Sequence, residues 1–135
     1  MAQLTCVVAP RANCQKADLR DANLSAVRLT HANLSYANLS GANLGGAHLG
    51  DADLSYANLS RANLTAATLI IANMKGADLS GAILTGADLR SADLEGANLQ
   101  GANLFAADLR RTKLSGAIWI DGQKMCGSGS LGVCK

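Results

Sequence analysis

Aromatic residues are scarce in this chain of 135 residues: they make up 3% of it, although 49% of the residues are hydrophobic. Ala and Leu supply most of the apolar content, which excludes an irregular core of interlocking rings and branched side chains. Charged residues make up 16% and the net charge is +2, a balance that argues against nucleic acid as a partner. The longest apolar runs, 69–72 and 117–120, are too short to span a bilayer, so no membrane insertion is expected.

Internal repetition dominates residues 12–121. These 110 residues divide into 22 consecutive units of five without insertion or deletion. Position one is Ala in 20 units, position three is Leu in 19 and position two is Asn or Asp in 16. On an α-helix, a period of five would step successive Leu side chains by about 140° around the axis, so no apolar stripe would form. A long helix is therefore excluded.

Each unit is predicted to be a minimal strand followed by a corner. In an extended segment, positions one and three point to one side and position two points to the other. Positions four and five are rich in Ser, Gly and Asp, which favour turns. If each corner turns the chain by about a right angle, four units close a square coil of 20 residues with Leu and Ala inside.

The motif A(D/N)LSx, repeated from Ala12 to Asp121, resembles the repeat of the pentapeptide-repeat family. The resemblance implies an all-β fold, a right-handed quadrilateral β-helix or β-solenoid. Four units per coil would give about five and a half coils and a rod of about 26 Å. The open ends of a solenoid need covering. We expect residues 1–11 to form an N-terminal cap or degenerate half-coil and residues 122–135 a C-terminal capping loop, with Trp119 as a lid.

The four cysteines lie in two pairs that flank the repeats: Cys6 with Cys14, and Cys126 with Cys134. One shared zinc site is excluded, because zinc–sulfur distances are about 2.3 Å and the two ends are about 26 Å apart. Two local disulfides are the economical alternative, although Cys14, at an inward Leu position, could equally be a small buried thiol. Disulfides would indicate the periplasm or the thylakoid lumen, with an export signal already removed, and free thiols the cytoplasm.

Residues 20 apart are expected to stack into columns. Tyr36 and Tyr56 share one column, where an aromatic stack that stiffens a corner is favoured over a ligand platform. On another face, Arg28, His48 and Thr68 replace Asn or Asp. The same face carries the candidate partner-binding patch, an apolar pair beside basic residues: Ile70, Ile71, Arg90, Arg110 and Arg111. A solvated charged face with two incidental Ile is the alternative.

The sequence offers little support for catalysis or for a metal site. His31 and His48 are the two histidines, and coil geometry brings neither into a pocket with a nucleophile and a carboxylate. A column of Asp53, Asn73 and Asp93 would present one oxygen-bearing side chain per step, which makes a weak cation site. The chain is therefore predicted to be non-enzymatic, with no catalytic residue, metal or cofactor.

Two functions remain. The first is a monomeric structural or protein-binding scaffold whose partner is another protein of unknown identity. The alternative comes from the resemblance, because some pentapeptide-repeat proteins mimic the girth and negative charge of DNA and bind DNA gyrase. Here ten acidic residues are interspersed with twelve basic ones, which cannot imitate a phosphate charge about every 1.7 Å. The scaffold is therefore preferred over the DNA mimic. An ice-binding array is excluded, since Thr30, Thr65 and Thr85 form no regular ladder.

Overall fold

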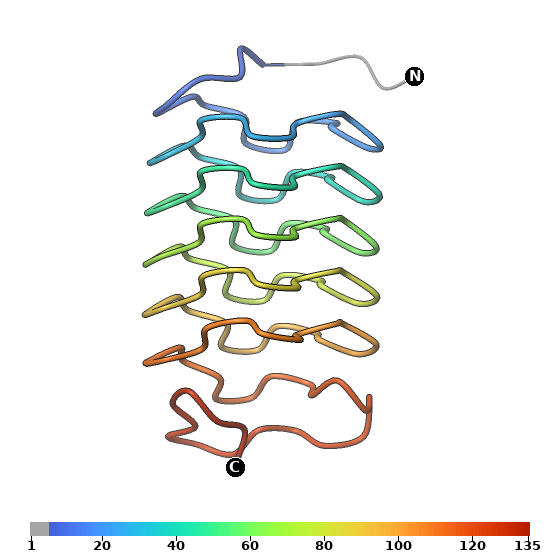
Figure 1. The fold of residues 1–135 in the computed structure, drawn as a ribbon, viewed down its shortest axis with the longest axis vertical. Coiled ribbons are helices and arrows are strands. Elements are labelled where there is room, and N and C mark those ends of the chain that lie inside the picture. Colours follow the sequence, from blue (N-terminus) through green and yellow to red (C-terminus); the bar gives the residue numbers. More distant parts are fainter. Residues whose placement is uncertain (1–5) are drawn as a thin grey trace.

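The computed structural model describes residues 6–135, and residues 1–5 of the expected N-terminal cap lie outside the described part. Within residues 6–135 the chain forms no helix and no strand longer than a single paired residue. It winds instead as a stack of similar coils, with the N-terminal and C-terminal ends of the described chain at opposite ends of the stack (Figure 1). The expected minimal strand is thus reduced to one bridging residue per unit, because the other residues of each unit belong to the corners.

Parallel bridges with a spacing of 20 residues hold the stack together. Every position-two residue from Asn13 to Asn98 pairs with the residue 20 positions later. Each unit therefore lies against the fourth unit after it, which is the register that a four-sided coil requires. Residues that share a unit position and differ by 20 in number consequently form columns along the rod.

The backbone donors of a typical unit are all satisfied, and position two contributes to this directly. In the unit 52–56 the five N–H groups donate, in order, to Leu49 O (3.1 Å), Ala32 O (2.9 Å), Asn73 O (2.6 Å), Asp53 Oδ1 (3.0 Å) and Lys75 O (2.9 Å). The fourth of these bonds explains the preference for Asn or Asp at position two. A side-chain oxygen there pairs with the N–H of position four, a donor that the coil-to-coil ladder leaves without a partner.

The corner between units is a type II turn. The carbonyl of position three accepts from the N–H of the next position one, as in the bond of 3.1 Å from Ala57 N to Leu54 O. Position five carries a positive φ, for example 57° at Tyr56 and 68° at Gly76. A type II turn needs this left-handed conformation at its third residue, and glycine adopts it at the lowest cost.

The core is a column of Leu flanked by Ala. Position three is fully buried from Leu29 to Leu99, with Met74 in place of one Leu, and position one is equally buried from Ala32 to Ala97. Each buried Leu stabilises the fold by about 1.5 to 3 kcal/mol. Position one is restricted to small residues because it lies beside the Leu in a narrow interior.

Two disulfides lie at opposite ends of the described chain. Cys6 is bonded to Cys14 and Cys126 to Cys134, with Cα atoms 5.3 Å and 4.8 Å apart. Cys14 is buried and disulfide-bonded, so of the two alternatives that the sequence leaves open for it the structure has the disulfide and not the free thiol. No helix among the described residues has the length and apolar character needed to cross a membrane.

The C-terminal segment folds back over part of the last coil. Antiparallel bridges join Lys113 to Leu131 and Ile118 to Met125. Trp119 is partly buried against the core, and its backbone N–H donates to Lys124 O at 2.7 Å. The preceding stretch, 102–111, has no such cover, and Leu104 and Leu109 are only partly buried there.

Candidate partner-binding site

The residues of the expected patch meet at one corner of the rod. Ile70, Arg90 and Arg110 share the position-four column, and Ile71 and Arg111 share the neighbouring position-five column. Bonds from Ile71 N to Arg90 O (3.1 Å) and from Ser91 N to Arg110 O (3.0 Å) hold these columns in register. We call the five residues Ile70, Ile71, Arg90, Arg110 and Arg111 the side-face patch.

A shallow hollow marks the patch on the surface. Its volume is about 350 Å³, and it is lined by Ile70, Arg90, Ser91, Arg110 and Arg111. Ile71 lies beside the hollow without lining it and is 56% exposed. Ile70 is half-buried, so it is less exposed than the apolar surface pair that the sequence predicts. The patch therefore presents one exposed aliphatic side chain next to a concave basic surface.

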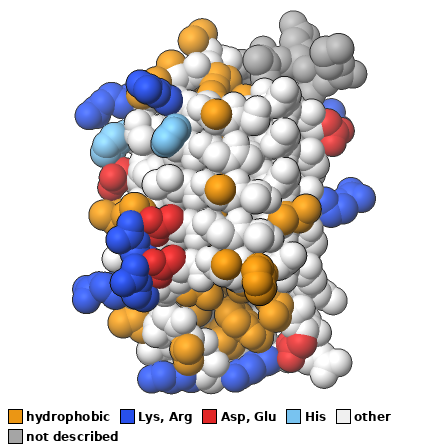
Figure 2. Space-filling view, in the orientation of Figure 1, with side chains coloured by type: hydrophobic (Ala, Val, Ile, Leu, Met, Phe, Trp, Pro, Cys, Tyr) orange, Lys and Arg blue, Asp and Glu red, His pale blue; other side chains and the backbone are white. Residues whose placement is uncertain are grey.

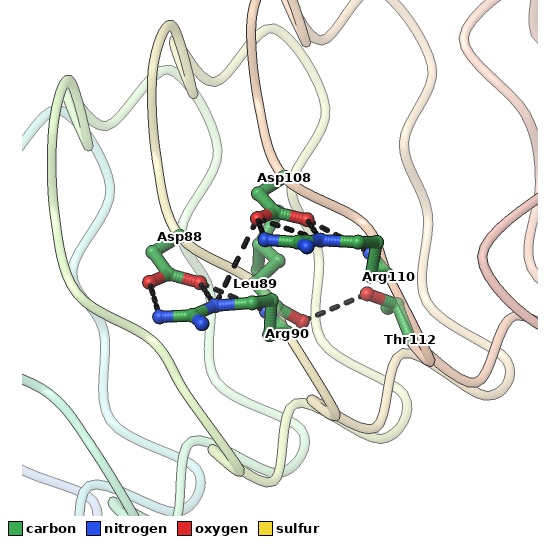
Figure 3. A network of polar contacts seen from close by, with 6 residues as sticks. All are labelled: Asp88, Leu89, Arg90, Asp108, Arg110 and Thr112. Carbon is green, nitrogen blue, oxygen red and sulfur yellow. Dashed lines mark hydrogen bonds and ion pairs between the residues drawn. The ribbon is translucent and has the colours of Figure 1, made fainter.

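Two of the three arginines are held by carboxylates of their own units. Arg90 donates to Asp88 from Nε (2.8 Å) and Nη2 (2.6 Å), and Arg110 donates to Asp108 from Nε (3.0 Å) and Nη2 (2.6 Å) (Figure 3). An ion pair across the coils adds to these, with Arg90 Nε 3.8 Å from Asp108 Oδ2. The motif Asp-Leu-Arg, which places the two side chains at positions two and four of one unit, recurs at both pairs, but sequence reasoning missed the pairing.

The paired arginines lower the pKa of the acids that they contact. The hydrogen bond from the Arg110 guanidinium lowers the pKa of Asp108 to about 2. The corresponding bond from Arg90 lowers the pKa of Asp88. Both carboxylates therefore stay ionised throughout the neutral range, and the two pairs cancel their own charges. Of the three arginines in the patch, only Arg111 forms no ion pair with a described residue, so the patch is less basic than its sequence predicts.

A buried threonine supports the backbone beneath the patch. Thr112 takes the place of Ala at position one and is completely buried. Its hydroxyl donates to Leu89 O at 2.7 Å (Figure 3). Leu89 lies between Asp88 and Arg90, which form one ion pair, and Thr112 belongs to the next coil, which carries the other pair. The bond therefore joins the backbones that carry the two ion pairs. Sequence reasoning missed this role, because a substitution of Ala by Thr reveals no partner by itself.

The remaining candidate residues do not line the hollow of the side-face patch. Tyr36 and Tyr56 stack with ring centroids 5.2 Å apart and ring planes 17° apart. Arg28, His48 and Thr68 form one ladder of bridges that continues into Asp88 and Asp108. The column of Asp53, Asn73 and Asp93 is also continuous. Among residues 6–135, no three His, Cys, Asp or Glu side chains are grouped in a way that could hold a metal ion.

Bridges at a spacing of 20 residues, a column of Leu inside and turns at every fifth residue define the class of this molecule as a four-sided β-solenoid. A family model described as pentapeptide repeats (8 copies) matches residues 11–46, 47–86 and 82–118. The chain belongs to the pentapeptide-repeat family. Proteins of this family are known as right-handed quadrilateral β-helices.

Several solved structures resemble the chain. HetL from the cyanobacterium Nostoc sp. strain PCC 7120, which is involved in regulating heterocyst differentiation, is 37% identical over 84% of this chain and 62% of its own, with a TM-score of 0.71. Rfr23 from the cyanobacterium Cyanothece 51142 is 44% identical over 69% of this chain and 64% of its own, with a TM-score of 0.68. This chain therefore spans less than two thirds of either protein.

A more distant structure shares the fold alone. Trypsin-treated QnrB1 R167E, a plasmid-mediated fluoroquinolone resistance protein, is 20% identical over 82% of this chain and 64% of its own, with a TM-score of 0.58. No curated protein matches the chain significantly. The comparisons thus establish the family, and the specific role rests on the surface of this chain.

Proposed function

We propose that the chain is a non-catalytic scaffold that binds another protein through the side-face patch. The observation that carries this proposal is the exposed side chain of Ile71 beside a hollow of about 350 Å³ walled by arginines. Arginine and exposed apolar side chains that become buried together are typical of the centres of protein interfaces. The partner would cover Ile71 and place an acidic group near the unpaired Arg111.

The solenoid supplies rigidity to this surface. Asp88 and Asp108 each fix a guanidinium in a two-point contact, which lowers the side-chain entropy that a partner would have to remove. Thr112 and the ladder beneath keep the two coils in register. A preorganised surface of this kind binds with little rearrangement of its own.

Paired substitutions test the patch. Ile71→Asp removes the exposed aliphatic side chain at the patch, whereas Ile83→Asp makes the same change at a side chain that is 42% exposed in a different column. With a photocrosslinking residue introduced at Ser91, we expect one protein from the native host to be captured by the wild type and by Ile83→Asp. Ile71→Asp should reduce that capture about tenfold or more, as loss of an interface hot spot does. Equal capture by both variants would refute the patch.

The layout of the chain follows from the same proposal. Residues 12–121 would form the binding body, with about five and a half coils of four units. Residues 1–11 would cover one end, and residues 122–135, together with Trp119, would cover the part of the other end that lies beside Lys113 and Ile118. The two disulfides indicate an oxidising compartment, such as the periplasm or the thylakoid lumen. Trapping of thiols in the native host tests this, and four alkylated cysteines would overturn it.

A DNA-mimicking function finds no support on this surface. Asp88 and Asp108, which follow one another in a column, are neutralised by Arg90 and Arg110. A mimic needs an uninterrupted run of negative charge along the rod. Supercoiling by DNA gyrase should therefore be unchanged in the presence of the protein, and inhibition or quinolone protection would reverse this ranking.

A further inference from the structure

One edge of the last coil has backbone donors without partners. Within the described part of the chain, four backbone N–H groups donate no hydrogen bond: those of Leu104, Ala106, Leu109 and Arg111. The four matching N–H groups one coil earlier do have partners, which are carbonyls of residues 103–110. Leu84 donates to Asn103 O (2.8 Å), Gly86 to Phe105 O (2.9 Å), Leu89 to Asp108 O (2.9 Å) and Ser91 to Arg110 O (3.0 Å). The ladder thus stops at residues 104–111, which we call the open edge.

The C-terminal segment leaves this edge uncovered because it pairs farther along the chain. Its bridges reach Lys113 and Ile118, on the two sides of the coil that follow the open edge. Gly132 lies close to the open edge, since a Cβ atom built there would lie 3.2 Å from Leu109 O and 3.5 Å from Arg111 N. Gly132 donates to Thr112 O at 2.8 Å, so it serves the neighbouring unit.

A second, larger hollow lies over the open edge. Its volume is about 850 Å³, and it is lined by residues 106–111 together with Leu131 and Gly132. Leu131, which lines the hollow, is 53% exposed, and Phe105, which directly precedes the lining residues in the chain, is 75% exposed. Figure 2 shows hydrophobic side chains gathered toward this end of the visible face, with Lys and Arg along one margin. Unpaired donors and exposed apolar groups in one place favour addition of a further extended segment.

Charge indicates which kind of segment would fit. Residues 104–135 contain five Lys or Arg and two Asp, a net charge of +3, whereas residues 1–103 contain seven basic and eight acidic residues, a net charge of −1. The end of the rod that carries the open edge is therefore the positive one. An acidic segment would be attracted to it and a basic one repelled.

We propose that the open edge binds an extended acidic segment of another protein, which adds one more rung to the solenoid. Its register follows from the coil below. The first pairing residue lies over Asp108, as Asp108 lies over Asp88, so its N–H donates to Ala107 O and its carbonyl accepts from Leu109. The side chain of the second residue of the segment points inward onto Leu109, and the carbonyl of its third residue accepts from the N–H of Arg111.

The same register specifies the side chains of the ligand. Asp108 lies 3.8 Å from Arg90 Nε of the coil below, so a carboxylate at the first pairing residue lies equally close to Arg110. A carboxylate three residues later lies over Arg111. The bound segment is therefore acidic, aliphatic, variable and acidic in order. This site uses backbone groups at the end of the rod, so it is distinct from the side-face patch although both include Arg110 and Arg111.

Hydrogen exchange of the free protein tests the edge itself. The amides of Leu104, Ala106, Leu109 and Arg111 should exchange much faster than the matched amides one coil earlier, those of Leu84, Gly86, Leu89 and Ser91. Equal protection of the two sets would overturn the proposal. Sedimentation velocity belongs to the same experiment, because a dimer with a protected edge would identify a second copy of this chain as the occupant and would also overturn it.

A synthetic peptide tests the ligand. The probe is a fluorescent octapeptide that contains Asp-Leu-Ser-Asp between Thr and Val residues, and its controls are a Lys-for-Asp version and a version with Pro at the first pairing residue. Only the acidic peptide should bind tightly. At a peptide concentration of about 100 times Kd, exchange at Leu109 should slow about 100-fold. Binding by the Pro peptide, or binding that leaves the amide of Leu109 unprotected, would refute strand addition.

Variants separate this site from the side-face patch. Arg111→Glu should weaken the acidic peptide about fivefold or more, because an attractive charge pair becomes repulsive. Ile71→Asp should leave peptide binding unchanged while it reduces capture at the patch about tenfold or more. If Ile71→Asp weakened both to the same degree, the two sites would be one and the separate edge site would be refuted.

Discussion

Gly76 is required because the ring of Tyr56 lies against it. A Cβ atom at position 76 would lie 2.5 Å from Cε1 and 2.6 Å from Cδ1 of Tyr56. The ring is held there by its stack on Tyr36. Gly76→Ala must therefore push the Tyr56 ring aside. Gly86, two units later, has a φ of 67° like the 68° of Gly76, but a Cβ atom there would meet nothing within 4 Å.

The two substitutions separate two costs. Gly86→Ala should lower the free energy of unfolding by about 1 kcal/mol, the cost of an alanine in the left-handed conformation. Gly76→Ala should lower the free energy of unfolding by the same amount and, in addition, remove the aromatic stack, which contributes about 0.5 to 1.5 kcal/mol. The expected difference between the two variants is therefore about 1 kcal/mol. For a chain of this size, that difference corresponds to a change of about 4 °C in Tm.

Thermal unfolding of four proteins measures this difference: the two single variants and the same two changes combined with Tyr56→Ala. In the Tyr56→Ala background the extra cost of Gly76→Ala should vanish, because no ring remains to be displaced. Near-ultraviolet circular dichroism should show loss of the tyrosine signal in Gly76→Ala alone of the single variants. An extra cost that persisted without the Tyr56 ring would show that contact with the ring is not its cause.

Three further outcomes follow from the structure. Asn63→Ala should destabilise the fold by about 1 to 3 kcal/mol and speed exchange of the Thr65 amide, since Asn63 Oδ1 accepts from both N–H and hydroxyl of Thr65; Asn63→Asp, which keeps the acceptor, should change little in urea unfolding. Reduction of the two disulfides, each with a sequence separation of 8, should cost about 2 to 3 kcal/mol per bond, and an unchanged Tm in dithiothreitol would contradict this. The pKa of Asp108 lies below the ordinary value, so its contribution to stability is complete above about pH 4 and is lost as the pH falls toward 2; NMR titration should find a midpoint near 2 that rises in Arg110→Ala.

Much of the fold could be predicted because its information is local and repeated. One Ala and one Leu in every five residues exclude a helix and make the inside of the coil the same at each level. The column partners, such as Tyr36 with Tyr56, follow once four units make a coil. Even the Asx-type bond at position two could have been found in the repeat itself, because its donor and acceptor lie within one unit. The turn at position five joins consecutive units, and the need for glycine at Gly76 comes from Tyr56 in the adjacent coil.

The candidate sites needed the tertiary structure. The repeat places Arg90 and Arg110 in one column, but only the folded side chains show that Asp88 and Asp108 neutralise them and leave Arg111 as the available cation. The path of the aperiodic C-terminal segment likewise could not be predicted, because it depends on long-range pairing with Lys113 and Ile118. By itself the sequence determined what lies inside and outside each coil; the tertiary structure decided which end of the ladder stays open, since competition among distant segments for the last unpaired backbone groups leaves no local pattern.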